Sequence, residues 1–372
     1  MVEMNSVLTL GSLSVTPYSL LMAGGAVLAL VLTLFLERKK LGADRVLTLF
    51  LITVPAAMIG GHLVWSIANF GRTEPYAEGF SIFWRFWVGG YTLYGAVLGA
   101  LLALWLYARR AKLSTGRIMD ALVPGACLAL AFGRAAEYFN GQGIGVLIED
   151  EAWRFFPVAI CTYADEYWQE WYLAVFAWEC MAALALLAVC LILRGKKLRA
   201  GSLTEIFLTL LGASQVLLEQ LRRDDCVAFH NDFIRLTQLL AVIVMLGVCL
   251  LRFIRDDKSL WRWQRLAVLV LGTVVVIFVE FAFEKPWSWP WLRISAGAEA
   301  LLCVWALLSL RNRRGRKPLV QAACVLVCAA VLIVLSFTVP DWEISLVPWL
   351  MMAGALAVMA QACLCQKNRE TA

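Results

Sequence analysis

The stretch YSLLMAGGAVLALVLTLFLERKK (residues 18–40) decides the fold class, because nineteen uncharged residues are followed at once by four charged ones, three of them basic. A helix of about this length crosses the roughly 30 Å of hydrocarbon in a bilayer. Lys and Arg accumulate in cytoplasmic loops. The stretch therefore predicts a transmembrane helix whose carboxyl end lies in the cytoplasm.

The composition of the whole chain indicates the same class. Of 372 residues, 62% are hydrophobic and 16% are charged, which excludes a soluble globular protein and an intrinsically disordered one. Sixteen Trp, nineteen Phe and nine Tyr suit aromatic belts at two membrane interfaces. We expect the chain to lie in a lipid bilayer. We expect no nucleic-acid partner, because the basic residues behind the net charge of +6 are distributed according to the membrane topology.

Ten further apolar runs follow the first one. We therefore predict an all-α polytopic membrane protein with about eleven transmembrane helices, at Tyr18–Leu36, Val46–Ala68, Gly89–Tyr107, Ile118–Phe132, Tyr172–Leu193, Leu203–Leu221, Leu236–Leu251, Leu266–Phe283, Ile294–Leu310, Leu319–Val339 and Ile344–Leu364. Alternate loops and the carboxyl-terminal end hold 24 of the 33 Lys and Arg. The amino terminus is thus expected outside a cell membrane and the carboxyl terminus inside. Residues 1–17 lack the basic start of a cleavable signal peptide.

Cysteine and histidine spacing gives no sign of a metal site. Most of the eleven Cys fall inside apolar runs, and no CxxC or Cys/His pattern is present, so we expect neither a metal nor a cofactor. Cys161 and Cys226 lie in two different outer loops. A disulfide between them and two free thiols both remain open.

Ionisable groups at membrane depth are costly and are therefore site candidates. The fourth run ends outward in GRAAEYFNGQGIG (133–145), which brings Arg134 to the level of the outer headgroups. Glycine lets the backbone approach a ligand closely, and a guanidinium fork matches a phosphate. The alternative is an interfacial helix end with a snorkelling Arg.

The sixth run carries Gln215, Glu219 and Arg222 at i, i+4 and i+7, on one stripe of the expected helix. A local Glu219–Arg222 ion pair is the structural alternative. Tyr94 and Tyr18, near the outward ends of two other expected helices, lie at a similar depth. We expect these groups to meet Arg134 in one pocket beneath the outer headgroups.

Other polar positions have a structural interpretation. His62 is expected to be a hydrogen-bonded bundle residue rather than a base, and Gly95-x-x-x-Gly99 a helix-packing face. Glu179 is placed near the middle of the fifth helix, where it binds a cation, stays protonated or bridges to another helix. The acidic loop 148–171 is expected to be solvated, with peptide docking as the minority interpretation.

Three stretches resemble the bacterial phosphatidylglycerol–prolipoprotein diacylglyceryl transferases. The family signature Gly-Arg-x-Gly-Asn-Phe-x-Asn-x-Glu, followed by Gly, is similar to residues 133–145, with matches at Gly133, Arg134, Asn140 and Gly145 and departures at Glu137, Tyr138 and Gln142. The family's Gly-Gly-x-Ser-x-His-Gly-Gly resembles GGYTLYGA, with Tyr94 where the His would stand. Its Phe-Arg-x-x-x-Glu-x-x-Arg-Glu resembles SQVLLEQLRRD (214–224), where Glu219 and Arg222 match and Gln215 replaces the Arg.

The resemblance implies transfer of diacylglyceryl from phosphatidylglycerol to the lipobox Cys thiol of a prolipoprotein, forming a thioether and releasing glycerol phosphate. Its partners are then phosphatidylglycerol and the prolipoprotein signal peptide. It implies three catalytic residues, Arg134, Tyr94 and Glu219, of which Arg134 anchors the phosphate, Tyr94 donates a hydrogen bond, and Glu219 either orients Arg222 or acts as base. It implies five substrate-binding residues, Tyr18, Asn140, Gly145, Arg222 and Gln215.

The resemblance covers about residues 1–256, which we predict to form a seven-helix transferase-like membrane domain, with 257–372 as a four-helix membrane extension. Two other functions stay open. Tyr94 and Gln215 favour a relative that binds a lipid or lipopeptide without transferring it. An ion-coupled transporter would use acids at the membrane midplane, namely Glu179, Glu280 and Glu299.

Overall fold

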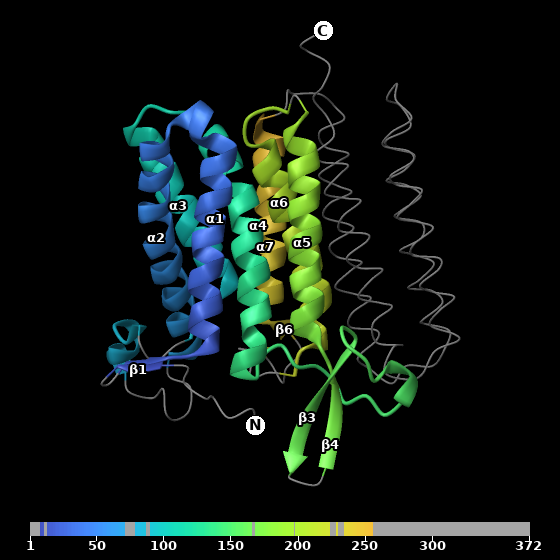
Figure 1. The fold of residues 1–372 in the computed structure, drawn as a ribbon. Coiled ribbons are helices and arrows are strands. Elements are labelled where there is room, and N and C mark those ends of the chain that lie inside the picture. Colours follow the sequence, from blue (N-terminus) through green and yellow to red (C-terminus); the bar gives the residue numbers. More distant parts are fainter. Residues whose placement is uncertain are drawn as a thin grey trace, which may run out of the picture. The chain divides into compact units, whose positions relative to one another are not determined.

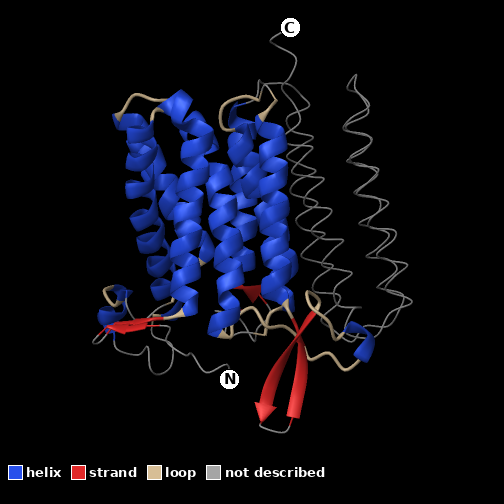
Figure 2. Cartoon of the chain, in the orientation of Figure 1, coloured by secondary structure: helices blue, strands red, loops and turns tan. Residues whose placement is uncertain are grey.

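The computed structural model describes residues 8–10, 13–70, 79–86, 90–165, 168–196, 198–223, 228–229 and 234–255. This part of the chain is mostly helical, as predicted (Figures 1 and 2). Its α-helices are α1 (Pro17–Leu41), α2 (Ala43–Asn69), α3 (Leu93–Arg110), α4 (Thr115–Glu137), α5 (Val175–Arg194), α6 (Ser202–Leu218) and α7 (Leu236–Arg255). The last four predicted spans lie outside the described residues.

Short 3₁₀-helices and strands lie at the helix ends. The 3₁₀-helices are η1 (Gly79–Phe83), η3 (Tyr138–Asn140), η4 (Glu151–Trp153) and η5 (Glu219–Leu221). The strands form three antiparallel pairs, β1 (Leu8–Leu10) with β2 (Leu13–Val15), β3 (Ala159–Asp165) with β4 (Trp168–Leu173), and β5 (Ala228–Phe229) with β6 (Ile234–Arg235).

The chain divides into two compact units. The first holds the described residues up to Phe207 and those of Leu218–Ala241; the second holds Leu208–Leu217 and the described part of α7 from Val242 onward. Helices α1 to α5 run side by side in the first unit, and the β3–β4 hairpin projects from the end where α4 stops and α5 begins (Figure 1).

Four helices within the described ranges are long and apolar enough to cross a membrane, namely α1, α2, α5 and the α4–η3 segment. Their surfaces expose large apolar side chains such as Phe35, Leu51 and Ile67. So much exposed apolar surface would be unfavourable in water, whereas lipid tails solvate it. The membrane class is thereby confirmed, while the count of eleven crossings and their direction stay predictions.

Glycine brings these helices into close contact. A Cβ on Gly25 of α1 would lie 2.5 Å from the Cβ of Phe132 on α4. Between α2 and α3, a Cβ on Gly95 would lie 2.5 Å from the Gly60 carbonyl oxygen, and one on Gly99 would collide with the Ala56 carbonyl oxygen. The Gly95-x-x-x-Gly99 motif is therefore a packing face, as the sequence indicated.

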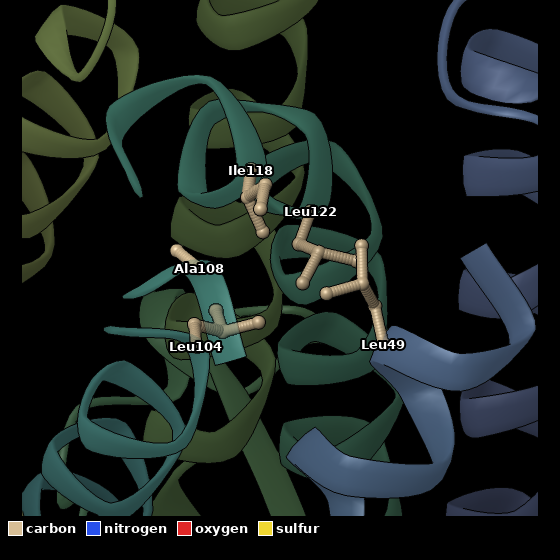
Figure 3. Packing of buried hydrophobic residues seen from close by; sticks show 5 residues of the cluster. All are labelled: Leu49, Leu104, Ala108, Ile118 and Leu122. Carbon is tan, nitrogen blue, oxygen red and sulfur yellow. The ribbon is translucent and has the colours of Figure 1, made fainter. Parts of the chain in front are cut away.

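Apolar packing and polar caps fix the end of the bundle that carries the α1–α2 and α3–α4 turns. There Leu49 of α2 meets residues of α3 and α4, in a buried cluster completed by Leu104, Ala108, Ile118 and Leu122 (Figure 3). Asp120 of α4 accepts hydrogen bonds from the backbone N–H groups of Gly201 and Thr204 at 2.7 and 2.8 Å. This carboxylate satisfies free donors at the start of α6, as a capping residue does.

Helix α3, the acidic segment and helix α6 differ from the sequence prediction in ways that affect the site. Helix α3 begins at Leu93 rather than Gly89, since Thr92 caps it by accepting from the Gly95 N–H at 3.2 Å. The acidic segment predicted as a solvated loop contains the β3–β4 hairpin. Helix α6 gives way to a 3₁₀ turn at Glu219, and Arg222 has extended backbone angles, so the predicted helical stripe does not reach Arg222.

The contact between α1 and α4 yields a matched pair of variants. Gly25→Ala should lower the free energy of unfolding by about 1–3 kcal/mol, because the new methyl overpacks against Phe132. Gly24→Ala should leave it unchanged or slightly higher, since nothing lies within 4 Å of that Cβ position. Thermal unfolding of the purified protein in detergent measures both. A Gly25→Ala protein that melts at the parent temperature would contradict this close contact.

Candidate functional site

The site lies in the first unit, where α4 ends and a glycine-rich loop turns toward α5. Gly143 has a φ of +70°, and a Cβ there would lie 2.6 Å from the Cβ of Phe176 and 3.0 Å from Glu137 Oε2. The Gly143 carbonyl accepts from the Phe176 N–H, and the Ile144 carbonyl from the Arg223 N–H, both at 2.9 Å. Only glycine fits this position without strain. The loop thereby fastens the end of α4 to the start of α5 and to the segment after η5.

A Cβ on Gly145 would be equally confined. It would lie 2.7 Å from the Leu221 carbonyl oxygen and 2.9 Å from the side chains of Leu173 and Val175. The Gly145 N–H donates to the Leu173 carbonyl at 2.8 Å. Predicted as a substrate-binding residue, Gly145 contacts η5 and the β4–α5 junction here.

Two arginines and two glutamates form a buried ion-pair network at this point. Arg134 Nη1 donates to Glu137 Oε1 at 2.5 Å and lies 3.3 Å from Glu179 Oε2. Arg222 Nη1 donates to Glu179 Oε2 at 2.8 Å and lies 3.0 Å from Glu137 Oε2. Each guanidinium thus contacts both carboxylates. In an apolar surrounding such mutual pairing offsets the cost of burying the charges.

The backbone around η5 is held by a third guanidinium. Arg235 Nη1 donates to the Glu219 carbonyl at 2.7 Å, and its Nη2 donates to the Arg222 carbonyl at 2.6 Å. Hydrogen bonds to a charged donor are worth more than neutral ones. They fix the turn that presents Arg222 to the network, although the sequence analysis assigned Arg235 no role.

Tyr94 is a further buried polar residue close to this network. It is fully buried near the start of α3, and among the described residues nothing hydrogen-bonds its hydroxyl. It lies within electrostatic range of Arg134 and Glu219, while Tyr18, at the start of α1, is within range of Arg134 and Glu137. A buried hydroxyl without a partner costs about 1–3 kcal/mol. The Tyr94 hydroxyl is therefore free to bond a ligand.

The structure brings together most of the predicted site residues. Arg134, Tyr94, Glu219 and Arg222 are buried in the first unit, and Tyr18 is partly buried. Asn140 is exposed at the end of η3. Gln215 is buried in the part of α6 that belongs to the second unit.

Glu137 and Glu179 were not among the predicted site residues, although a bridge from Glu179 to another helix was one of its three interpretations, and its contact with Arg134 of α4 confirms that bridge. Glu137 was noted as a departure from a motif, and Glu179 was placed near the middle of a helix. Because α5 begins at Val175 rather than Tyr172, Glu179 lies in its second turn, level with the end of α4. The available signal was a charged side chain in an apolar helix, which needs a partner.

His62 has a structural role, and the remaining polar positions singled out in the sequence lie outside the network or outside the described residues. His62 is buried, and its Nδ1 and Nε2 lie 3.1 and 3.0 Å from the carbonyl oxygens of Gly90 and Ile82, which confirms a hydrogen-bonded bundle residue. Cys161 is a free thiol in β3, and Cys226 lies outside the described residues. Glu280 and Glu299 also lie outside the described residues. Within the described ranges, no group of three His, Cys, Asp or Glu side chains is placed to hold a metal ion.

Comparison with known proteins identifies one family, and the matched residues include all four members of the ion-pair network. A family model for prolipoprotein diacylglyceryl transferase matches residues 5–254. The chain belongs to this family. Relatives in Streptococcus pneumoniae strains JJA and Hungary19A-6, named phosphatidylglycerol–prolipoprotein diacylglyceryl transferase, are 27% identical over 254 residues, which are 67% of this chain and 94% of each relative. Family membership and the apolar helices together make the chain a membrane-bound diacylglyceryl transferase.

The ion-pair network predicts which glutamates contribute to the folding stability of this diacylglyceryl transferase. Glu179→Gln should lower the free energy of unfolding by on the order of 3 kcal/mol, because it leaves two buried guanidiniums with one carboxylate fewer. Glu151→Gln is the matched control, since that side chain is 90% exposed, and it should melt with the parent. Thermal unfolding in detergent compares the two. Equal melting temperatures would mean that the network contributes nothing to stability.

Proposed function

We propose that this chain transfers the diacylglyceryl group of phosphatidylglycerol to the thiol of the lipobox Cys in a prolipoprotein, forming a thioether and releasing glycerol phosphate. The names of the relatives describe this substrate pair. The observation that carries the proposal is the pair of buried guanidiniums, Arg134 and Arg222, together with the unbonded hydroxyl of Tyr94, which lies within electrostatic range of Arg134. A preorganised cluster of donors in an apolar site stabilises an anion far better than water-exposed donors do.

The predicted residues of the first unit each have a role in the proposed reaction. Arg134 and Arg222 hold the phosphate and take up the charge that develops as glycerol phosphate leaves. Tyr94 donates a hydrogen bond to the departing oxygen, and Glu219, buried within range of both Arg134 and Tyr94, orients them. Tyr18, Asn140 and Gly145 supply the remaining predicted contacts to the lipid headgroup and acyl region. Gln215 lies in the second unit, and its lipid contact stays a prediction from the sequence. The nucleophile is the thiolate of the peptide Cys.

The membrane arrangement is part of the proposal. We infer about eleven crossings in a bacterial plasma membrane, with the amino terminus and the site toward the outer side and the carboxyl terminus inside. The loops near Arg38 and Arg110 carry dense basic clusters, whereas the segment around Glu149 is acidic, which supports this direction. Residues 257–372 are proposed as a four-helix membrane extension.

Reporter fusions measure this arrangement. Alkaline phosphatase fused after Lys112 should be inactive and green fluorescent protein at the same place fluorescent, because the α3–α4 turn is expected in the cytoplasm. The same fusions after Asp150 should give the reverse result. Active phosphatase at Lys112 would invert the proposed orientation.

A second candidate function is a relative that binds a lipid or lipopeptide without transferring it. Two observations favour it: Tyr94 stands where the family motif has a His, and Gln215 stands where it has an Arg. Both functions predict lipid binding that depends on Arg134, so only a transfer assay separates them.

In isolated membranes that contain phosphatidylglycerol, this chain should attach a diacylglyceryl group to a lipobox peptide. The transfer is measured as an increase in the mass of the peptide. Arg134→Ala should abolish the transfer, and Arg134→Lys should retain only a small part of it, because an ammonium lacks the planar fork. Arg110→Ala, which removes an exposed guanidinium at the far end of α3, is the control and should transfer at the parent rate.

Two results would contradict the proposal in different ways. Full activity in a folded Arg134→Ala protein would remove Arg134 from the mechanism. A parent that binds phosphatidylglycerol yet leaves the peptide mass unchanged would support the binder instead.

A further inference from the structure

We propose that Glu137 acts twice in this site: it occupies the anion position on Arg134 and Arg222 until a lipid phosphate displaces it, and it then takes the proton of the attacking thiol. This inference rests on the proposed transferase function. It assigns a base to a chain in which the family's motif His is replaced by Tyr94.

The contacts of Glu137 are those that a phosphate would make. Its Oε1 accepts from Arg134 Nη1 at 2.5 Å, and its Oε2 lies 3.0 Å from Arg222 Nη1. One oxygen therefore faces each guanidinium. The two non-bridging oxygens of a phosphodiester can bridge two guanidiniums in the same way. A lipid phosphate and the Glu137 carboxylate thus compete for the same donors.

Of the two paired glutamates, Glu137 is the one that can move. The Glu179 side chain has no exposed surface, and its Oε2 is shared by both guanidiniums. The Glu137 side chain is 15% exposed and stands in the last turn of α4, directly before the loop that begins with η3. Rotation of the partly exposed Glu137 side chain away from the arginines frees the cations, whereas rotation of Glu179 would require repacking of α5.

The charged groups around Glu137 explain why displacement by a phosphate increases the proton affinity of its carboxylate. Arg134 on its own helix and Arg222 beyond η5 contact it directly, and Tyr18 on α1 lies within electrostatic range of it. Glu179 and Glu219 share the field of Arg134. Once the phosphate holds both guanidiniums, Glu137 is a carboxylate without a cation among other anions. Such a carboxylate binds a proton more readily, because burial and like charge both disfavour its ionised form.

The proposed step balances in atoms and electrons. The S–H proton passes to the Glu137 carboxylate, and the thiolate electron pair forms the C–S bond with the diacylglyceryl carbon. The bond between that carbon and the phosphate oxygen breaks, and its electron pair stays on the oxygen. Glycerol phosphate leaves with one more negative charge than the lipid phosphate carried, next to Arg134 and Arg222. The total charge of the site is unchanged, because Glu137 has become neutral.

The test combines binding and transfer in Glu137→Gln, which keeps the shape of the side chain and removes its charge. Binding of dioctanoyl phosphatidylglycerol to the protein in phosphatidylcholine nanodiscs should tighten by roughly tenfold, because no anion has to be displaced. Transfer to a lipobox peptide at pH 7 should fall by about 10²-fold or more, the usual contribution of a general base. The remaining rate should climb with pH until the peptide thiol ionises, near pH 8.5. Glu151→Gln, an exposed glutamate, should match the parent in both assays.

Tighter binding together with slower transfer is a result that a purely structural role does not produce. Unchanged transfer and an unchanged pH profile in Glu137→Gln would overturn the proton step, and weaker lipid binding would overturn the displacement step. If Glu137→Gln fails to fold, as judged by melting, Glu137→Asn replaces it, since the family signature has Asn at this position. A parent without transfer activity overturns the proposed function and the proton step together, and the binding measurement alone then decides the displacement step.

Discussion

Two guanidiniums and two carboxylates share a small buried volume at one end of a bundle of apolar helices, and this pairing constrains everything around it. An isolated charge buried among these helices would cost several kcal/mol. Arg134 and Glu179 therefore bring α4 and α5 to the same level, and Arg222 requires the chain after η5 to return to them. The network positions the site and stabilises the fold by the same contacts.

The glycine-rich loop makes that convergence geometrically feasible. Gly143 packs against Phe176 and Glu137, and Gly145 against Leu221, with no space for a side chain at either position. Backbone hydrogen bonds from this loop reach both the start of α5 and Arg223. The motif thus acts chiefly through its backbone, which holds charged side chains from three segments within contact distance of one another.

The ion-pair network gives a physical reason for a departure from the family signature. Glu137 stands where the signature has Asn, and it adds a negative charge beside Arg134. Glu179 adds another, so the charges of the four-residue network cancel. A neutral site has little net attraction for a phosphate, and a lipid must exchange for an internal anion. Such an exchange ties lipid binding to the availability of a proton acceptor, which suits a transferase whose motif His is replaced by Tyr94.

The sequence by itself determined the membrane class, the first seven helices, the packing role of Gly95 and Gly99, and the shared level of Arg134, Tyr94 and Glu219. Those features follow from local periodicity, apolar length and depth, which neighbouring residues along the chain specify. It could not determine that Arg222 pairs with Glu137 and Glu179 rather than with Glu219, or that α6 loosens before Arg222. Only the tertiary structure decided these points, because the partner of a buried charge is whichever opposite charge the packing of other helices brings within reach.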